Sequence, residues 1–214
     1  MNLGSRRNPN ASSPLYLVLV AVSVLGCSRG HESGPTTAET VTPGGSTVLV
    51  WGNGRQGVVL AHGASYDAAS WEDQARVMAD QGIAVAAVEE LSAAAVADAA
   101  GFLRAEGSTK VTLVGSSAGA ASVIEAAGSD PAVADGLVLL SPAGGDLGSV
   151  DSVPVLVLYS QDESYADGVE SMVAAASGVD VEARALPGDR HGQGIFNGDQ
   201  ADAVVDAIVE YAGR

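Results

Sequence analysis

The sequence has few basic residues, few aromatic residues and a single cysteine, Cys27. Lysine and arginine together number 10 against 26 aspartates and glutamates, which gives a formal net charge of −16. Binding to a phosphate backbone depends on lysine and arginine, so this balance argues against nucleic acid as a partner. The three histidines and the one cysteine form no cluster in the sequence that would indicate a metal site.

Long hydrophobic runs are also scarce, and the longest lies near the start of the chain. Residues 15–25 are almost wholly apolar and follow Arg6 and Arg7. A membrane-spanning helix needs about 20 such residues, so this run is too short to cross a bilayer. A basic start followed by a short apolar run is typical of a signal peptide.

The apolar run ends at Cys27. The residues Val24, Leu25 and Gly26 before it resemble a bacterial lipobox. This resemblance implies removal of residues 1–26 and attachment of lipid to Cys27, which would anchor the exported protein to the outer face of a bacterial membrane. The alternative is an ordinary secretory signal with an incidental thiol.

The segment that follows, residues 27–46, is rich in glycine, proline, serine and threonine and has no apolar period. This composition predicts a flexible tether.

Residues 47–214 have the length and pattern of one domain. Strand-like apolar runs alternate with helix-length segments, and the runs are nearly continuous, as in parallel strands covered on both faces. We therefore expect an α/β fold with a mostly parallel sheet and helices on both faces. The expected strands cover residues 47–51, 57–61, 83–88, 111–114, 136–140, 153–158 and 179–183.

Local signals predict turns and helix starts. The Asn53-Gly54 pair predicts a hairpin between the first two strands. Ser70 and Asp73 have the spacing of a capping box, with aspartate in place of glutamate or glutamine, and predict a helix that starts there. The expected helices cover residues 70–81, 91–106, 118–127, 163–176 and 199–211.

Two adjacent serines stand where a strand runs into a helix, in Gly115-Ser116-Ser117-Ala118-Gly119. The glycines lie two residues on either side of Ser117, which is the spacing of a nucleophile elbow, a strained turn where a flanking side chain would clash. In a chain with 27 glycines the pattern alone is weak evidence. Ser117 is the candidate nucleophile, and a plain strand-to-helix turn is the alternative.

Upstream, His62 and Gly63 end an earlier strand. With these motifs, residues 47–214 resemble the small α/β-hydrolases without a lid domain, similar to dienelactone hydrolases and bacterial carboxylesterases. The resemblance implies an oxyanion hole made of the backbone amides of Ala64 and Ala118, and a structural role for His62. Only a short link separates the strand at 136–140 from the next, so we expect no lid.

The resemblance also implies an acid and a base. His191, after the last strand, stands where the family places its catalytic histidine. The acid usually lies in Gly-x-x-Asp, but here Ser160 replaces the glycine and Glu163 falls at the acid position, with Asp162 beside it as an alternative. The chain order of Ser117, the acid and His191 is that of this fold.

These features predict a serine hydrolase that cleaves a small or exposed acyl substrate without a metal or organic cofactor. The alternative is a catalytically silent hydrolase fold that serves as a tethered binding protein, because a fold alone does not give function. A nucleotide-binding α/β domain is disfavoured because no G-x-G-x-x-G pattern follows the first strand.

Overall fold

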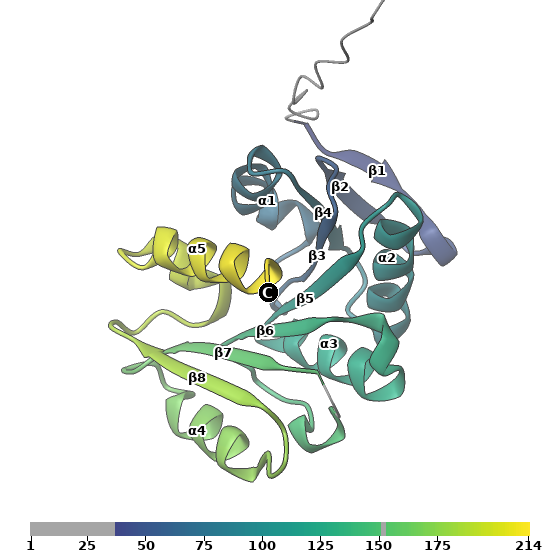
Figure 1. Ribbon diagram of the computed structural model, residues 1–214. Coiled ribbons are helices and arrows are strands. Elements are labelled where there is room, and N and C mark those ends of the chain that lie inside the picture. Colours follow the sequence, from purple (N-terminus) through teal and green to yellow (C-terminus); the bar gives the residue numbers. More distant parts are fainter. Residues whose placement is uncertain (1–36, 151–152) are drawn as a thin grey trace, which may run out of the picture. The chain divides into compact units, whose positions relative to one another are not determined.

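In the computed structural model of the chain, residues 37–150 and 153–214 are described (Figure 1). The expected signal peptide, Cys27 and the first part of the expected tether lie outside these residues. The described residues form an eight-stranded sheet in the order β1-β2-β4-β3-β5-β6-β7-β8. The strands are β1 (Glu39–Val41), β2 (Val48–Trp51), β3 (Gln56–Ala61), β4 (Ile83–Val88), β5 (Lys110–Ser116), β6 (Gly136–Leu140), β7 (Val155–Ser160) and β8 (Val181–Leu186).

The six strands from β3 to β8 are parallel, and their central members are buried on both faces. All residues of β4, β6 and β7 are buried, which explains why their sequences are continuous apolar runs. Only β8, at the edge of the sheet, has exposed positions throughout its length. The mostly parallel sheet expected from the sequence is thus confirmed.

The hairpin expected at Asn53-Gly54 is wrong. β2 pairs with β4 in the antiparallel sense, whereas β3 lies between β4 and β5 and is parallel to both. Residues 57–61 of β3 are buried, and two parallel neighbours complete the hydrogen bonds of such a central strand. The Asn53-Gly54 pair indicates a turn, but it does not determine which strands pair. The buried strand β3 pairs with β4 and β5 rather than with β2.

The sheet also begins earlier than expected. Residues 39–41, placed in the tether by composition, form β1 and pair with β2 through the register Glu39 to Val50 and Val41 to Val48. The sheet domain therefore starts before residue 47. Backbone pairing along an edge strand requires no apolar period, so composition could not reveal it.

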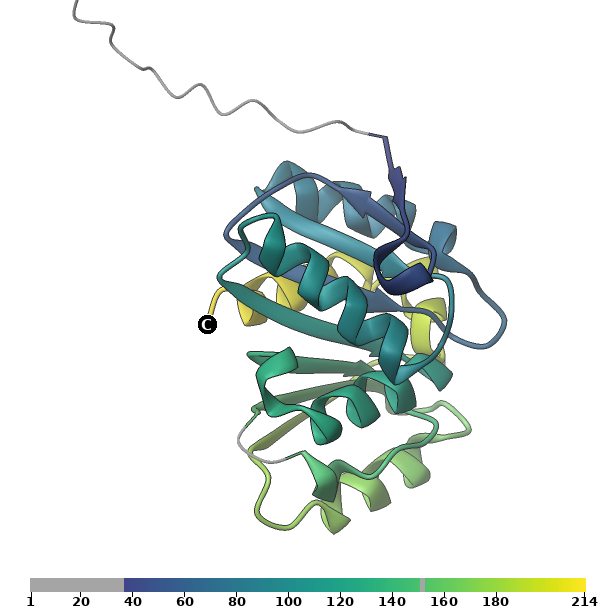
Figure 2. The ribbon, with the colours of Figure 1, turned by 90° about the vertical axis from the view of Figure 1, so that its right-hand side faces the viewer.

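Helices cover both faces of the sheet (Figures 1 and 2). One layer packs α2 (Ala93–Ala105), α3 (Ala118–Ser129) and α4 (Ala166–Ala175) against strand residues such as Val59. The other packs α1 (Glu72–Asp80) and α5 (Ala201–Ala212) against residues such as Val58. Neighbouring strand residues face opposite layers, as the pleat requires.

The helix starts agree with the sequence in part. The Ser92 side chain accepts a hydrogen bond from the Ala95 amide and caps α2. The capping box expected at Ser70 is wrong, because Ser70 lies in a short 3-10 helix, η2 (Ala68–Trp71), that precedes α1. The carboxylate of Asp67 accepts from the Ser70 amide at 2.9 Å and caps that turn instead.

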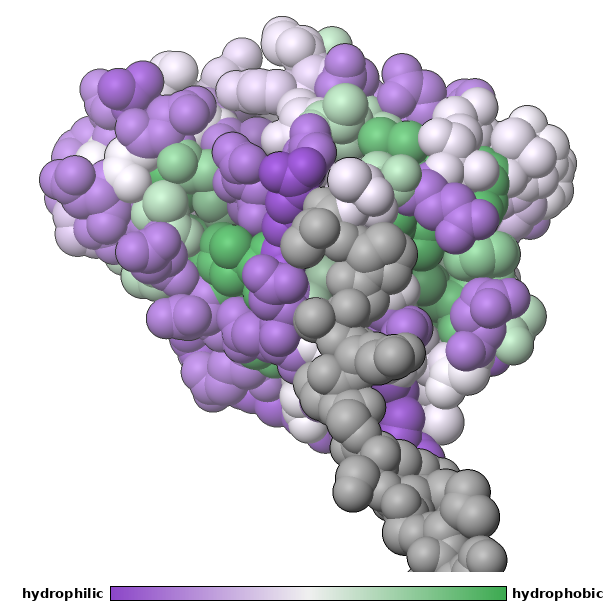
Figure 3. Space-filling model, turned by 90° about the horizontal axis from the view of Figure 1, so that it is seen from above, coloured by the Kyte–Doolittle hydropathy of each residue, from purple (hydrophilic) through white to green (hydrophobic). Residues whose placement is uncertain are grey.

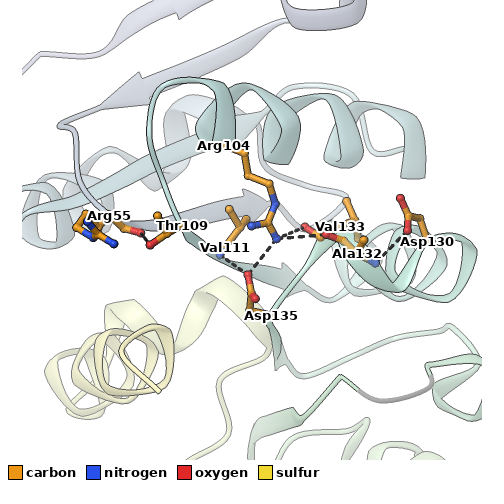
Figure 4. A network of polar contacts seen from close by, with 8 residues as sticks. All are labelled: Arg55, Arg104, Thr109, Val111, Asp130, Ala132, Val133 and Asp135. Atoms are coloured by element: carbon orange, nitrogen blue, oxygen red, sulfur yellow. Dashed lines mark hydrogen bonds and ion pairs between the residues drawn. The ribbon is translucent and has the colours of Figure 1, made fainter.

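A polar network ties α2 to the sheet at the amino ends of β5 and β6 (Figure 4). The Asp135 carboxylate accepts from the Val111 amide at 2.8 Å and from the Arg104 guanidinium at 2.9 Å. The same guanidinium donates to the carbonyls of Ala132 and Val133. This network fixes the end of the sheet opposite the strand ends that carry the expected site residues.

Hydrophilic residues cover much of the face seen in Figure 3, and apolar residues form separate patches between them. Among the described residues, none of the helices combines the length and the hydropathy that crossing a membrane would require.

Candidate active site

The expected site residues follow the carboxyl ends of parallel strands. His62 follows β3, Ser117 follows β5, Glu163 comes three residues after β7, and His191 lies beyond β8. Parallel strands end at one edge of the sheet, so residues far apart in sequence meet there. His191 precedes another short 3-10 helix, η5 (Gly192–Asn197).

Ser117 occupies a strained turn between β5 and α3. Its backbone has φ of 50° and ψ of −110°, a conformation that residues other than glycine rarely adopt. Its amide donates to the Leu140 carbonyl at 2.9 Å, and its carbonyl accepts from the Ala143 amide at 3.3 Å. These bonds to the end of β6 hold the turn in place.

The two flanking glycines permit this turn. A Cβ on Gly115 would lie 2.6 Å from the Ala120 Cα, and one on Gly119 would lie 2.4 Å from the Ala61 carbonyl oxygen. Both contacts involve backbone atoms, which cannot move aside at low cost. The structure therefore confirms that a side chain at either flank of the elbow would clash with the backbone.

Ser117, His191 and Glu163 form one hydrogen-bonded chain. His191 Nε2 lies 2.8 Å from Ser117 Oγ, and His191 Nδ1 lies 2.7 Å from Glu163 Oε2. An ionised carboxylate only accepts hydrogen bonds, so Nδ1 carries the proton in this arrangement and Nε2 is free to accept the serine hydroxyl. This is the tautomer that a general base requires.

The structure distinguishes the two carboxylates that the sequence left open. The Glu163 side chain is 1% exposed, and its second oxygen, Oε1, has no hydrogen-bond partner among the described residues. Asp162 is exposed, and its carboxylate lies 3.4 Å from the amide nitrogen of Gln161. Glu163 is thus the carboxylate in contact with His191, and Asp162 has no hydrogen bond to the histidine among the described residues.

The backbone amides of Ala64 and Ala118 are free among the described residues. Ala118 is the first residue of α3, where amides have no acceptor within the helix. Ala64 follows Gly63, which packs beside the elbow, since a Cβ on Gly63 would lie 3.6 Å from Ser117 Cβ. Both amides therefore belong to segments that border Ser117.

His62 is buried and held by backbone carbonyls on both sides of its ring. Nδ1 lies 2.8 Å from the Gly63 carbonyl oxygen, and Nε2 lies 3.0 Å from that of Glu89. The ring contacts neither Ser117 nor Glu163 through a hydrogen bond, so its placement fits the structural role expected for it.

Gln193 is a site residue that the sequence did not reveal. It is buried, and its backbone amide donates to Ser116 Oγ at 2.9 Å. Its side chain accepts from the Gly63 amide at 2.8 Å and donates to Ser70 Oγ at 2.9 Å. A lone glutamine has no sequence signal, because its partners come from segments far from it in the chain.

Comparison with solved structures identifies the fold. The dienelactone hydrolase from Anabaena variabilis superposes with a TM-score of 0.65 at 18% identity, covering 84% of this chain and 97% of that one. A hyperthermophilic esterase from Pyrobaculum calidifontis gives 0.67 at 17% identity, covering 82% and 84%. A serine hydrolase involved in carbazole degradation, the CarC enzyme, gives 0.64 at 16% identity, covering 83% and 98%.

No protein-family model matches the chain, and no curated protein matches it either. The sheet order, the helix layers and these neighbours together define the class: the chain has the α/β-hydrolase fold. At such low identity the neighbours establish the fold, and the chemistry must be argued from the site itself.

Proposed function

We propose that the protein is a serine hydrolase that cleaves a carboxylic ester or related acyl bond through an acyl-enzyme intermediate. The observation that carries the proposal is the hydrogen-bonded chain from Ser117 Oγ through His191 to the buried Glu163, with distances of 2.8 and 2.7 Å. Its solved structural neighbours include an esterase and a serine hydrolase, which supports the same reaction class.

In the proposed reaction His191 Nε2 takes the proton of Ser117 as its oxygen attacks the acyl carbon. Glu163 keeps the imidazole in the required tautomer and stabilises the imidazolium that forms. The amides of Ala64 and Ala118 donate to the oxyanion, and the amino end of α3 favours the negative charge. His191 then protonates the leaving group and afterwards activates water to release the acyl group.

The proposed substrate is small, or is exposed where a larger molecule presents its acyl group. The link between β6 and β7 contains one short 3-10 helix, Leu147–Ser149, in its described part and no inserted lid. An open site does not enclose a long acyl chain, whose transfer from water would need an apolar cavity.

A catalytically silent binding protein is the second candidate, because a hydrolase scaffold can be kept for binding alone. Labelling by a fluorophosphonate probe separates the two. The active hydrolase becomes covalently modified at Ser117, whereas a silent scaffold is unmodified after long incubation.

Replacement of Ser117 by alanine should abolish labelling and lower ester hydrolysis by roughly 10³-fold or more, because the nucleophile is lost. The matched control is Ser116→Ala, which leaves the nucleophile in place but removes the hydroxyl that accepts from the Gln193 amide. It should still label, at a reduced rate. Mass spectrometry of the labelled peptide and initial rates on short-chain esters measure both effects. Labelling that survives Ser117→Ala would contradict the assignment.

A further inference from the structure

We propose that Gln193 is a positioning residue that sets the oxyanion-hole segment against the catalytic histidine; this inference rests on the proposed function. Gln193 lies two residues after His191, in η5, and the start of this helix is held against the elbow by the Gln193 amide. Gly192 has φ of +53°, and a Cβ there would lie 2.6 Å from Ser116 Oγ. The chain can approach Ser116 this closely only because residue 192 is glycine.

The orientation of the Gln193 amide follows from its partners. The Gly63 backbone N–H can only donate, so the side-chain oxygen must face it, at 2.8 Å. The amide nitrogen then faces Ser70 Oγ at 2.9 Å. Ser70 Oγ in turn donates to the Asp67 carbonyl, so the hydrogen bonds continue into the cap of η2.

The Gln193 side chain affects the proposed oxyanion hole because it binds the amide of Gly63, the neighbour of Ala64. Gly63 N–H is bound to Gln193, and Ala64 N–H is left as the amide available to the oxyanion. Gln193 is 4% exposed, so water cannot replace its side chain at Gly63 without displacement of η5. Loss of the side chain would therefore free the segment that presents Ala64.

The test compares an ester with the matching thionoester, in which sulfur replaces the carbonyl oxygen. Sulfur is a weak hydrogen-bond acceptor, so a thionoester gains little from the oxyanion hole. Gln193→Met keeps the side-chain volume and removes both side-chain hydrogen bonds. We expect its ester kcat to fall by roughly ten- to a hundredfold, with a smaller loss on the thionoester, so that the ester-to-thionoester ratio drops.

Two further variants complete the test. Ser70→Ala removes only the outer hydrogen bond and should leave the ratio near that of the wild type. Ser116→Ala removes the backbone anchor of Gln193 and should lower the ratio even if Gln193→Met does not fold. If Gln193→Met is active and its ester-to-thionoester ratio is unchanged, Gln193 does not have the proposed role. If Gln193→Met does not fold, an unchanged ratio in Ser116→Ala leads to the same conclusion. Either result leaves the proposed hydrolase function intact. Wild-type protein that hydrolyses neither substrate and resists fluorophosphonate would overturn the proposed function and this inference with it.

A second inference rests on a different observation, the placement of exposed aromatic rings. Three large apolar side chains are exposed among the described residues, namely Tyr66, Val77 and Tyr165. Tyr165 is 54% exposed, and its ring lies 4.6 Å from the His191 ring at a tilt of 37°. Tyr66 is 42% exposed and borders Gly63, so Tyr66 lies beside the segment that precedes Ala64 and Tyr165 lies beside His191.

From this placement we infer that Tyr165 binds a planar, aromatic group in the alcohol part of the ester. His191 must protonate the leaving oxygen, so the alcohol part lies on the His191 side of Ser117, next to Tyr165. An aromatic ring stacks on tyrosine more favourably than a saturated ring of equal size. Like the first inference, this one rests on the proposed function.

Benzyl acetate and cyclohexylmethyl acetate test this inference, because both are acetates of primary alcohols that carry a six-membered ring. We expect wild-type kcat/KM to favour the benzyl ester by roughly three- to tenfold. Tyr165→Ala should remove this preference, and Tyr165→Phe should keep it. Val77→Ala, on the exposed side of α1, should change neither rate.

A wild-type ratio near one, or a preference that survives in Tyr165→Ala, would overturn the inference while leaving the hydrolase intact. Failure of the wild type to hydrolyse either acetate and to react with a fluorophosphonate would instead overturn the proposed function.

Discussion

Ser117 and Ser116 are adjacent but lie in different surroundings, and this difference distinguishes the two candidates. Ser117, in the strained conformation, presents its hydroxyl to His191. Ser116, the last residue of β5, is fully buried and accepts from the Gln193 amide. Strain at a single non-glycine residue persists only where surrounding contacts enforce it, and such residues gather at functional sites. The elbow geometry therefore supports Ser117 as the nucleophile more strongly than the motif did.

The surroundings of single residues also distinguish the two acidic candidates, Glu163 and Asp162. Glu163→Gln should lower kcat by a factor on the order of 10³–10⁴. A neutral amide no longer selects the required tautomer of His191 or stabilises its imidazolium form. Asp162→Asn should leave kcat almost unchanged, because its carboxylate is exposed and, among the described residues, bonds only to the Gln161 side chain. Steady-state rates on one short-chain ester measure both. Equal and small losses would place the acid elsewhere.

Two glycines in the described domain have very different packing surroundings: Gly115 lies at the elbow, and Gly101 lies on the surface of α2. Gly115 supports the contact between β5 and α3, where a Cβ would lie 2.6 Å from Val123 Cγ2 and from the Ala120 backbone. Gly101 lies inside α2 with nothing within 4 Å of an added Cβ. The first glycine serves packing, whereas the second is conformationally costly in a helix without a packing reason.

Opposite changes in stability should result from the same substitution at these two sites. Gly101→Ala should raise the free energy of unfolding by roughly 0.5–1 kcal/mol, because alanine restricts the unfolded chain and suits a helix. Gly115→Ala should lower it by roughly 1–3 kcal/mol or more, because backbone atoms must shift. Urea titrations followed by circular dichroism measure both. A stable Gly115→Ala protein would mean that the elbow tolerates a side chain.

The packing of α5 on the sheet predicts a pH effect. Burial raises the pKa of Tyr211 to about 12, and the ring lies against β6, where a Cβ on Gly136 would be 2.9 Å from Tyr211 Cε1. Between the ordinary tyrosine pKa, near 10, and this raised value, the unfolded chain loses the phenolic proton while the folded chain keeps it. The stability that depends on the neutral phenol is therefore present below pH 10 and lost as the pH rises toward 12.

Tyr211→Phe has no proton to lose, so its stability should decline less steeply than that of the wild type over this interval. Denaturant titrations at a series of pH values between 9 and 12 would show the difference. Parallel declines for the two proteins would mean that the phenol ionises alike in the folded and unfolded chains.

At the scale of the whole molecule, the acidic charge and the amino-terminal segment concern where the protein works. The net charge of −16 favours solubility and disfavours association with anionic membrane surfaces or nucleic acid. We propose that attachment to a membrane instead depends on lipid at Cys27, with the sheet beginning at Glu39. Lipid attachment by two or more acyl chains gives stable anchoring, whereas one chain binds only marginally.

Cys27→Ser should therefore move the protein from the detergent phase to the aqueous phase in cell fractionation, because the attachment site is lost. Ester hydrolysis per molecule should not change, since the proposed catalytic residues lie in the sheet domain. Wild-type protein found only in the aqueous, secreted fraction, and cut after a residue other than Gly26, would show that Cys27 is an ordinary thiol.

The sequence by itself determined the layered α/β fold, the elbow at Ser117 and the order of the site residues along the chain. These features depend on local patterns. Continuous apolar runs indicate buried parallel strands, and glycines at fixed offsets indicate a tight turn. Edge strand β1 carried no such pattern and was assigned to the tether.

Tertiary structure alone decided which strands pair, which carboxylate contacts His191 and what holds the segment that precedes Ala64. Asp162 and Glu163 are neighbours in sequence, yet Asp162 is exposed, whereas Glu163 is buried and contacts the imidazole of His191. Gln193 contacts Gly63, Ser70 and Ser116 across more than 70 positions of chain. Such long-range contacts arise from packing of the whole sheet, so no short stretch of sequence contains them.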